Sequence, residues 1–147
     1  MVNPTIEPTI DYSENGKLIV LEKGFRPETI HYSVLAELDG KVYMTYERER
    51  NIAIKRRRRK TEAYVSAHLD KVPWVLADPD KVIVDPDYPD SARIYYRMFE
   101  LETGERIGLA VPICTKEPKY VYTVHDWKGK TVKGEARGLT ITWLKRR

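Results

Sequence analysis

A chain of 147 residues with 41% hydrophobic and 33% charged residues is expected to fold as one compact soluble domain, and this composition excludes a disordered tail. The net charge of +4 excludes little by itself, but one cysteine, Cys114, excludes an intramolecular disulfide and favours a reducing cytoplasm. No apolar run approaches the roughly 18 residues of a membrane span, and the first residues lack a signal-peptide pattern, so we expect no membrane partner.

The charge is distributed unevenly along the chain. The net charge is −4 for residues 1–40, +6 for 41–75, −4 for 76–103 and +6 for 104–147. If folding brings the two basic blocks together, they form a cationic surface suited to a polyanion. The charge pattern therefore favours nucleic acid as the class of partner.

The N-terminal part is predicted to hold an extended arm and a β-hairpin. Residues 1–12 contain Pro4 and Pro8 and predict the arm, and residues 17–22 predict a short strand. Apolar and polar residues alternate over 30–38, which predicts a half-buried strand. The dipeptide Asp39-Gly40 suits the tight turn that would pair this strand with residues 41–46.

Helices are predicted to follow the hairpin. Residues 46–60 are mostly charged and helix-tolerant and do not alternate, which predicts a short helix that runs into a basic segment. Thr61 suits the N-cap of a second helix, whose apolar residues continue at helical spacing to Val72. Pro73 then opens a further turn, because proline is tolerated at a first helical position.

The second half of the chain is predicted to form a meander of antiparallel strands. We expect strands over residues 82–84, 92–101, 106–114, 119–124 and 139–144, with residues 126–138 as a loop between the last two. Helices followed by such a meander favour an α+β domain. In it, the N-terminal hairpin and the helices would pack on an antiparallel sheet of about four to five strands.

The strongest local feature is a run of six consecutive cations. The run consists of Lys55, Arg56, Arg57, Arg58, Arg59 and Lys60. These charges repel one another, and a bound phosphate backbone would relieve the repulsion and release counterions. Arg48 and Arg50 lie one or two helical turns earlier. The alternative is a solvated helix end, in which the helix dipole and nearby glutamates accommodate the cations.

His125 is the candidate for acid–base chemistry. It ends the predicted strand of residues 119–125, on the same face as Thr123, whereas Tyr122 lies on the other face. A strand-end histidine beside a hydroxyl can act as general acid or base near neutral pH. An exposed tyrosine there can stack on an unpaired base. The alternative for His125 is a surface histidine with no role, and we expect His31 and His68 to be structural or exposed.

We expect neither a metal nor a cofactor. Carboxylates at positions 78, 80, 85, 87 and 90 could hold Mg²⁺ or Ca²⁺, but Asp-Pro pairs beside a strand are ordinary turn chemistry. The three histidines lack a metal-ligand spacing, and one cysteine cannot supply a zinc cluster.

The order of these features resembles the nucleases of the barnase, EndoU, colicin and RelE group, especially their phage-associated members. The motifs that carry the resemblance are VYMTYERERNI at residues 42–52, ADPDKVI at 77–83, the strand at 93–99 and YVYTVH at 120–125. Relatives commonly place a histidine before the isoleucine of the first motif, where this chain has Asn51. Relatives have another histidine at the end of that helix, where this chain has arginines.

This resemblance implies metal-independent cleavage of RNA in the cytoplasm. A base removes the 2′-hydroxyl proton, the oxygen attacks phosphorus, cations stabilise the added charge, and an acid protonates the leaving 5′-oxygen. It implies His125 as acid or base and Thr123 as a positioning hydroxyl. The implied transition-state cations are Arg48, Arg50 and Lys55. The residues expected to hold single-stranded RNA are Arg56, Arg57, Arg58, Arg59, Lys60 and Tyr122.

Two alternatives remain open at this point. One is a nucleic-acid-binding module that keeps the fold and the basic surface but lacks chemistry. The other is a toxin-like or mobile-element protein whose charges serve a protein partner, such as an acidic antitoxin.

Overall fold

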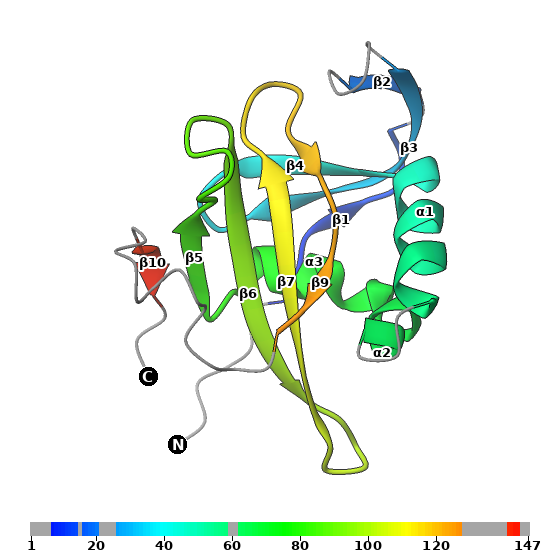
Figure 1. Cartoon of the computed structure of the whole chain (residues 1–147). Helices are drawn as coiled ribbons and strands as arrows, with labels where there is room; N and C mark the ends of the chain where they lie inside the picture. The colour runs from blue at the N-terminus through cyan, green and yellow to red at the C-terminus, as the bar shows by residue number, and fades with distance from the viewer. Residues whose placement is uncertain (1–6, 15, 21–25, 59–61, 128–140, 145–147) are drawn as a thin grey trace.

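The computed structural model describes residues 7–14, 16–20, 26–58, 62–127 and 141–144 (Figure 1). Arg59, Lys60 and the predicted N-cap Thr61 lie outside the described residues, and so does nearly all of the loop expected over residues 126–138.

Strands open and close the chain, with helices between them. The N-terminal strands are β1 (Ile10–Asp11), β2 (Lys17–Val20), β3 (Arg26–Ala36) and β4 (Gly40–Thr45). The helices are α1 (Tyr46–Arg57), α2 (Ala63–Ala67) and α3 (Val72–Ala77), with a 3-10 turn at Leu69–Lys71. The later strands are β5 (Lys81–Val84), β6 (Ala92–Glu100), β7 (Arg106–Cys114), β8 (Tyr120–Val121), β9 (His125–Asp126) and β10 (Ile141–Leu144).

The chain is α+β, with an open mixed sheet. The strands follow the order β1-β3-β4-β8-β7-β6-β5-β10, while β2 adds to β3 and β9 adds to β7. The expectation of an antiparallel sheet of four to five strands was wrong on two counts. The described residues contain more strands, and β4 pairs with β8 in parallel through Tyr43 and Tyr120. The parallel pair arises because the chain reverses after β7 and returns beside β4.

The predicted N-terminal hairpin is present as β3 and β4, which pair antiparallel. The β3–β4 turn spans residues 37–39, and Gly40 adopts a φ of +69°, a left-handed conformation that glycine reaches without strain. Asp39 belongs to this turn, and its side chain is also buried. Its carboxylate pairs with Arg93 and accepts a hydrogen bond of 2.6 Å from the Tyr95 hydroxyl.

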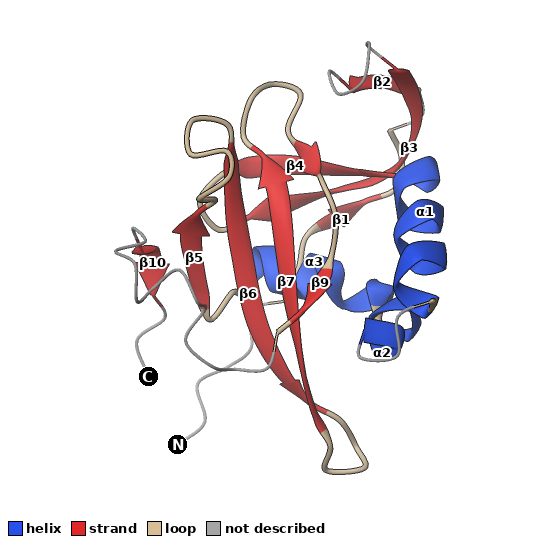
Figure 2. Ribbon diagram, viewed as in Figure 1, coloured by secondary structure: helices blue, strands red, loops and turns tan. Residues whose placement is uncertain are grey.

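The helices gather on one side of the sheet (Figure 2). Helix α3 contacts β3, β6 and β7, and α1 contacts β3 and β4. Between these layers lies the main core, which includes Val34, Met44, Ile52, Val72, Leu76, Tyr95, Leu109 and Val121. On the other face of β6 and β7, Tyr96 and Ala110 pack with Trp127. Both faces of β7 are therefore covered, which explains why residues 107–113 are all buried.

Two details of the fold position the site. Thr45 caps α1, because its side-chain oxygen accepts from the backbone N–H of Arg48 at 3.2 Å. The strand predicted over residues 119–124 ends at Val121 and resumes only as β9.

None of the described helices is long and apolar enough to cross a membrane.

Candidate nucleic-acid interface

Arg56 ties the last turn of α1 to the segment between β8 and β9. Its side chain turns inward and is only 1% exposed. Its Nε donates to the carbonyl oxygen of Val124 at 2.7 Å, and Nη1 donates to Glu62 Oε2 at 2.7 Å. The charge of Arg56 is therefore balanced by Glu62 inside the protein, and the guanidinium anchors the helix end.

The same guanidinium brings together two residues that the sequence singled out. Arg56 Nη2 lies 3.2 Å from Thr123 Oγ1 and 2.8 Å from His125 Nδ1. Because a guanidinium can only donate, Nδ1 of His125 is the acceptor. The neutral ring therefore carries its proton on Nε2. Arg56, Thr123, His125 and Glu62 form one contiguous group, which we call the Arg56 cluster.

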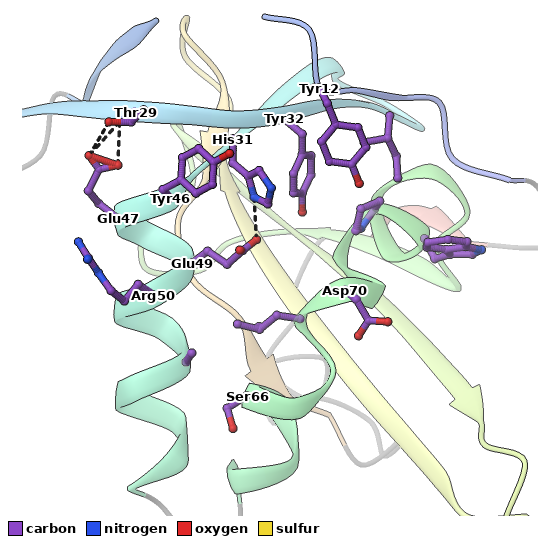
Figure 3. Close-up of a pocket in the computed structure, with 15 residues that line it drawn as sticks. Tyr12, Thr29, His31, Tyr32, Tyr46, Glu47, Glu49, Arg50, Ser66 and Asp70 are labelled. Carbon is purple, nitrogen blue, oxygen red and sulfur yellow. Dashed lines mark hydrogen bonds and ion pairs between the residues drawn. The ribbon is translucent and has the colours of Figure 1, made fainter. Parts of the chain in front are cut away.

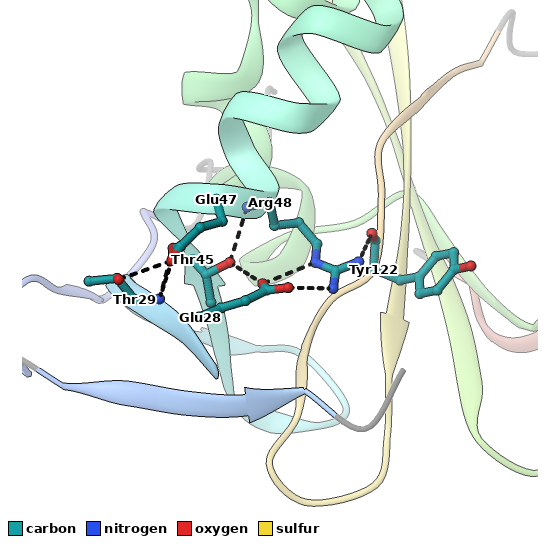
Figure 4. A network of polar contacts seen from close by, with 6 residues as sticks. All are labelled: Glu28, Thr29, Thr45, Glu47, Arg48 and Tyr122. Carbon is teal, nitrogen blue, oxygen red and sulfur yellow. Dashed lines mark hydrogen bonds and ion pairs between the residues drawn. The ribbon is translucent and has the colours of Figure 1, made fainter. Parts of the chain in front are cut away.

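Arg48 holds the same segment from one end of the helix (Figure 4). Its Nη1 donates to the Tyr122 carbonyl oxygen at 2.9 Å, and Nη2 donates to Glu28 Oε2 at 3.0 Å. Glu28 is buried and also accepts a 2.5 Å hydrogen bond from the Thr45 hydroxyl. The guanidinium lies 5.1 Å and 5.7 Å from the ring centroids of Tyr120 and Tyr122. Arg48 is thus held by a buried carboxylate and by two aromatic rings.

The two arginines explain why the predicted strand is interrupted. The carbonyl oxygens of Tyr122 and Val124 accept hydrogen bonds from Arg48 and Arg56 rather than from a neighbouring strand. Thr123 lies between these two residues, and its hydroxyl is held beside the helix end, 3.2 Å from Arg56 Nη2.

The other cations of the run that the structure describes are not buried. Lys55, Arg57 and Arg58 are exposed at the end of α1, and we call these three residues the cationic end of α1. Arg50 is also exposed, but it lines a separate cavity between α1 and β3. The structure therefore groups Arg56, Thr123 and His125, and it places Arg50 apart from them.

Two exposed aromatic rings lie at the Tyr122 end of the segment between β8 and β9. Tyr122 is 37% exposed and Tyr88 is 52% exposed, and their ring centroids are 6.2 Å apart. Both line a small cavity of about 150 Å³. Rings placed in this way can stack on unpaired bases.

Tyr64 is unsuited to act as a base near this cluster. Its hydroxyl donates to the Gly108 carbonyl oxygen at 3.0 Å. Burial, together with the charge of Asp126, raises its pKa to about 12, so the phenol keeps its proton near neutral pH. The acid–base groups that remain in the Arg56 cluster are Glu62 and His125.

The sequence did not identify Glu62 or Glu28 as part of this site. Glu62 follows the basic run by two residues and was considered only as a local partner of its charges. The burial of Arg56 could have been inferred from its spacing, because Ile52 and Arg56 are four residues apart and share one helix face.

Among the described residues, no group of three or more His, Cys, Asp and Glu side chains could hold a metal ion. Comparison of the chain with protein-family models, with curated proteins and with solved structures found no match.

Proposed function

We propose that this chain binds single-stranded RNA on the surface formed by the cationic end of α1 and residues 122–125. One observation carries the proposal. Arg56 turns inward and fixes the helix end against Thr123 and His125, while Lys55, Arg57 and Arg58 stay exposed on the same turn. The helix end therefore combines exposed cations with a hydroxyl and an imidazole that Arg56 holds in place.

The chemistry of this surface suits a phosphate backbone with unpaired bases. The three exposed cations would neutralise phosphates and release counterions, which favours binding without sequence preference. Tyr122 and Tyr88 offer ring faces on which bases can stack. Arg48 and Arg56 contribute less to this charge, because Glu28 and Glu62 already balance them. The choice of RNA over DNA rests on the resemblance to the barnase and RelE nucleases. The proposal that the fold is arranged as in barnase or RelE rests on the same resemblance.

Cleavage of the bound RNA is the second candidate function. The observation that favours it is the placement of a carboxylate and an imidazole, Glu62 and His125, on one guanidinium. Glu62 would take the proton from the 2′-hydroxyl, whose oxygen then attacks phosphorus. His125 would first take up a proton at Nδ1, which displaces the Arg56 donor, and the imidazolium would then give its Nε2 proton to the leaving 5′-oxygen. The products would be a 2′,3′-cyclic phosphate and a 5′-hydroxyl end.

Binding is the favoured function of the two. Arg56 is almost fully buried, and its donors contact protein groups, so it acts in this structure as a positioning residue. Cleavage needs cations that reach the phosphorane, and in the described part of the helix end these are Lys55, Arg57 and Arg58. An acidic protein partner would compete for the same three cations.

Fluorescence anisotropy with a short labelled single-stranded RNA tests binding. The variant to measure combines Lys55→Ser, Arg57→Ser and Arg58→Ser. A control with the same change of charge combines Lys41→Ser, Arg106→Ser and Lys116→Ser, three cations that are exposed elsewhere. We expect the first variant to bind at least about tenfold more weakly than the control. Equal affinity of the two variants would contradict the proposed surface.

Incubation of the labelled RNA with the protein in EDTA, beside an all-2′-deoxy strand of the same sequence, separates the two functions. Cleavage of the RNA alone, with a cyclic phosphate end, supports the second candidate. Intact RNA that is shifted on a gel supports binding alone. If the RNA is neither shifted nor cleaved at low salt, both binding and cleavage are ruled out.

A further inference from the structure

A second site lies between α1, β3 and α3, where the structure has a cavity of about 950 Å³ (Figure 3). Aromatic rings form much of its wall. His31 stacks on Tyr46 with 4.3 Å between ring centroids, and it meets Tyr32 edge-on at 5.0 Å. Tyr12 lies 5.7 Å from Tyr32, and Trp74 also lines the cavity. The faces of such rings carry negative potential and attract cations.

The charged groups of this cavity are mostly negative. Glu47, Glu49 and Asp70 line it, against one cation, Arg50. Burial opposes ionisation of Glu47, but hydrogen bonds from the backbone N–H and the hydroxyl of Thr29 outweigh it and lower the pKa of this carboxyl. An acidic cavity in a chain of net charge +4 selects for a positive ligand and against a phosphate.

The Tyr32 hydroxyl is a buried polar group that lacks a hydrogen-bond partner within the described part of the chain. Tyr32 is 4% exposed, and its hydroxyl has no hydrogen-bond partner among the described residues. Figure 3 shows this hydroxyl directed into the cavity, with the Glu49 carboxylate beside it and Asp70 lower in the view. Burial, assisted by the charge of Glu49, raises the pKa of Tyr32, so the group stays neutral. An unpaired buried hydroxyl costs stability unless something else satisfies it.

We propose that this cavity binds a small organic cation that carries N–H donors, such as an alkylammonium or alkylguanidinium ion. Tyr32 accepts one N–H hydrogen bond, Glu49 and Asp70 supply the opposite charge, and the rings of Tyr12 and Tyr46 cover the alkyl part. Each of these carboxylates also has a contact within the protein: Glu49 Oε2 lies 3.3 Å from His31 Nδ1, and Asp70 Oδ2 lies 3.8 Å from Lys71 Nζ. Glu47 contributes charge at longer range, because both of its carboxylate oxygens accept hydrogen bonds from Thr29. The site is independent of RNA binding, since its ligand has the opposite charge and contacts other faces of α1.

Calorimetric titration with n-butylammonium and n-butylguanidinium chloride tests the site, with n-pentanol as a neutral control of similar size. We expect both cations to bind at least about tenfold more tightly than the alcohol, because a hydrogen bond to a charged group contributes more than one to a neutral group. Binding of pentanol as tight as that of the cations would overturn the proposal, and so would the absence of cation binding.

Two conservative variants locate the binding. Glu49→Gln and Tyr32→Phe should each weaken binding of n-butylammonium by about tenfold or more, whereas Glu102→Gln in the exposed β6–β7 turn should not. Tyr32→Phe should leave the melting temperature of the free protein unchanged or higher, because it removes an unsatisfied buried group. Unchanged affinity in Tyr32→Phe, with the cation still bound, would contradict the assignment of the hydroxyl.

Discussion

Arg56 shows how one residue in a run of like charges can have a different role from its neighbours. The sequence predicted that it would hold substrate, because six cations in a row carry no apolar marker of an inward face. In the structure it lies buried on the face of α1 that also contains Ile52, and it pairs with the half-buried Glu62. The helical spacing contained this information, but the partner Glu62 lies beyond the end of α1, so the pairing could not be predicted from the helix alone.

Replacing Arg56 should destabilise the protein. Arg56→Gln removes the positive charge that faces the half-buried Glu62 and the donor to the Val124 carbonyl oxygen. Breaking a buried pair in this way typically costs about 3–5 kcal/mol. Arg57→Gln, on the exposed side, should change the free energy of unfolding by no more than about 0.5 kcal/mol. Urea denaturation of both variants measures the difference, and equal stabilities would show that the Arg56 cluster holds nothing in place.

His125→Ala separates cleavage from binding. A general acid contributes about a hundredfold to ten-thousandfold in rate, so any RNA cleavage should fall by at least about a hundredfold. RNA affinity should change little, because the cationic end of α1 is untouched. The free energy of unfolding should fall by about 1 kcal/mol, since Arg56 loses one acceptor but keeps Thr123.

His31→Ala is the control for this rate measurement, because His31 lies in the other cavity. Cleavage by His125→Ala at the parent rate would remove His125 from the mechanism.

Glu47 links stability to pH. Its pKa is lowered in the folded protein from an ordinary value of 4.5, so it contributes stability that is present above that value and is lost as the pH falls through the folded pKa. Glu47→Gln should therefore reduce the free energy of unfolding at pH 7 more than at pH 3. Thermal or urea unfolding at both pH values gives the comparison. If the free energy of unfolding differs between variant and parent by the same amount at pH 7 and pH 3, the assigned role of the Thr29 hydrogen bonds is contradicted.

At the scale of elements, local signals were reliable and non-local pairing was not. Strand β7 was predicted with the bounds observed, and β6 within one residue, because their alternation and turns are local. The parallel pairing of β4 with β8 could not be predicted, since it joins residues far apart in sequence. The sequence did not predict the break after Val121 for a similar reason. The side chains that donate hydrogen bonds to the carbonyl oxygens of residues 122 and 124 belong to α1, far away in sequence.

Gly108 controls where β9 can lie. The carbonyl oxygen of Trp127 lies against the Cα of Gly108, so a Cβ at this position would overlap it. Gly108→Ala must therefore displace backbone, at a cost of about 1–3 kcal/mol. Because β9 pairs with β7 through His125 and Ala110, the shift also moves the histidine.

We expect Gly108→Ala to lower the melting temperature and to weaken amide protection of residues 125–127 in hydrogen exchange. Gly104→Ala, in the open β6–β7 turn at a φ of +87°, is strained but should leave the protection of residues 125–127 unchanged. Unaltered protection in Gly108→Ala would mean that β9 does not depend on this close approach.

For the whole molecule, the distribution of charge in space differs from its distribution in sequence. The sequence predicts two basic and two acidic blocks, but folding pairs arginines of the basic and acidic blocks with carboxylates from other elements. These pairs are Arg48 with Glu28, Arg56 with Glu62, Arg93 with Asp39 and Arg97 with Asp78. Among the described residues at the end of α1, Arg56 is buried, and Lys55, Arg57 and Arg58 remain exposed. The RNA-binding proposal depends on that set.

The salt dependence of RNA affinity tests this account most directly. The slope of log affinity against log salt changes by about 0.7 for each phosphate that a cation neutralises on a single strand. Replacing Lys55, Arg57 and Arg58 by serine should therefore flatten the slope by about 2, whereas Arg56→Lys, at a buried position, should leave it nearly unchanged. If the triple variant keeps the parent slope, or if Arg56→Lys flattens it as much, the exposed cations of α1 are not the RNA-binding surface.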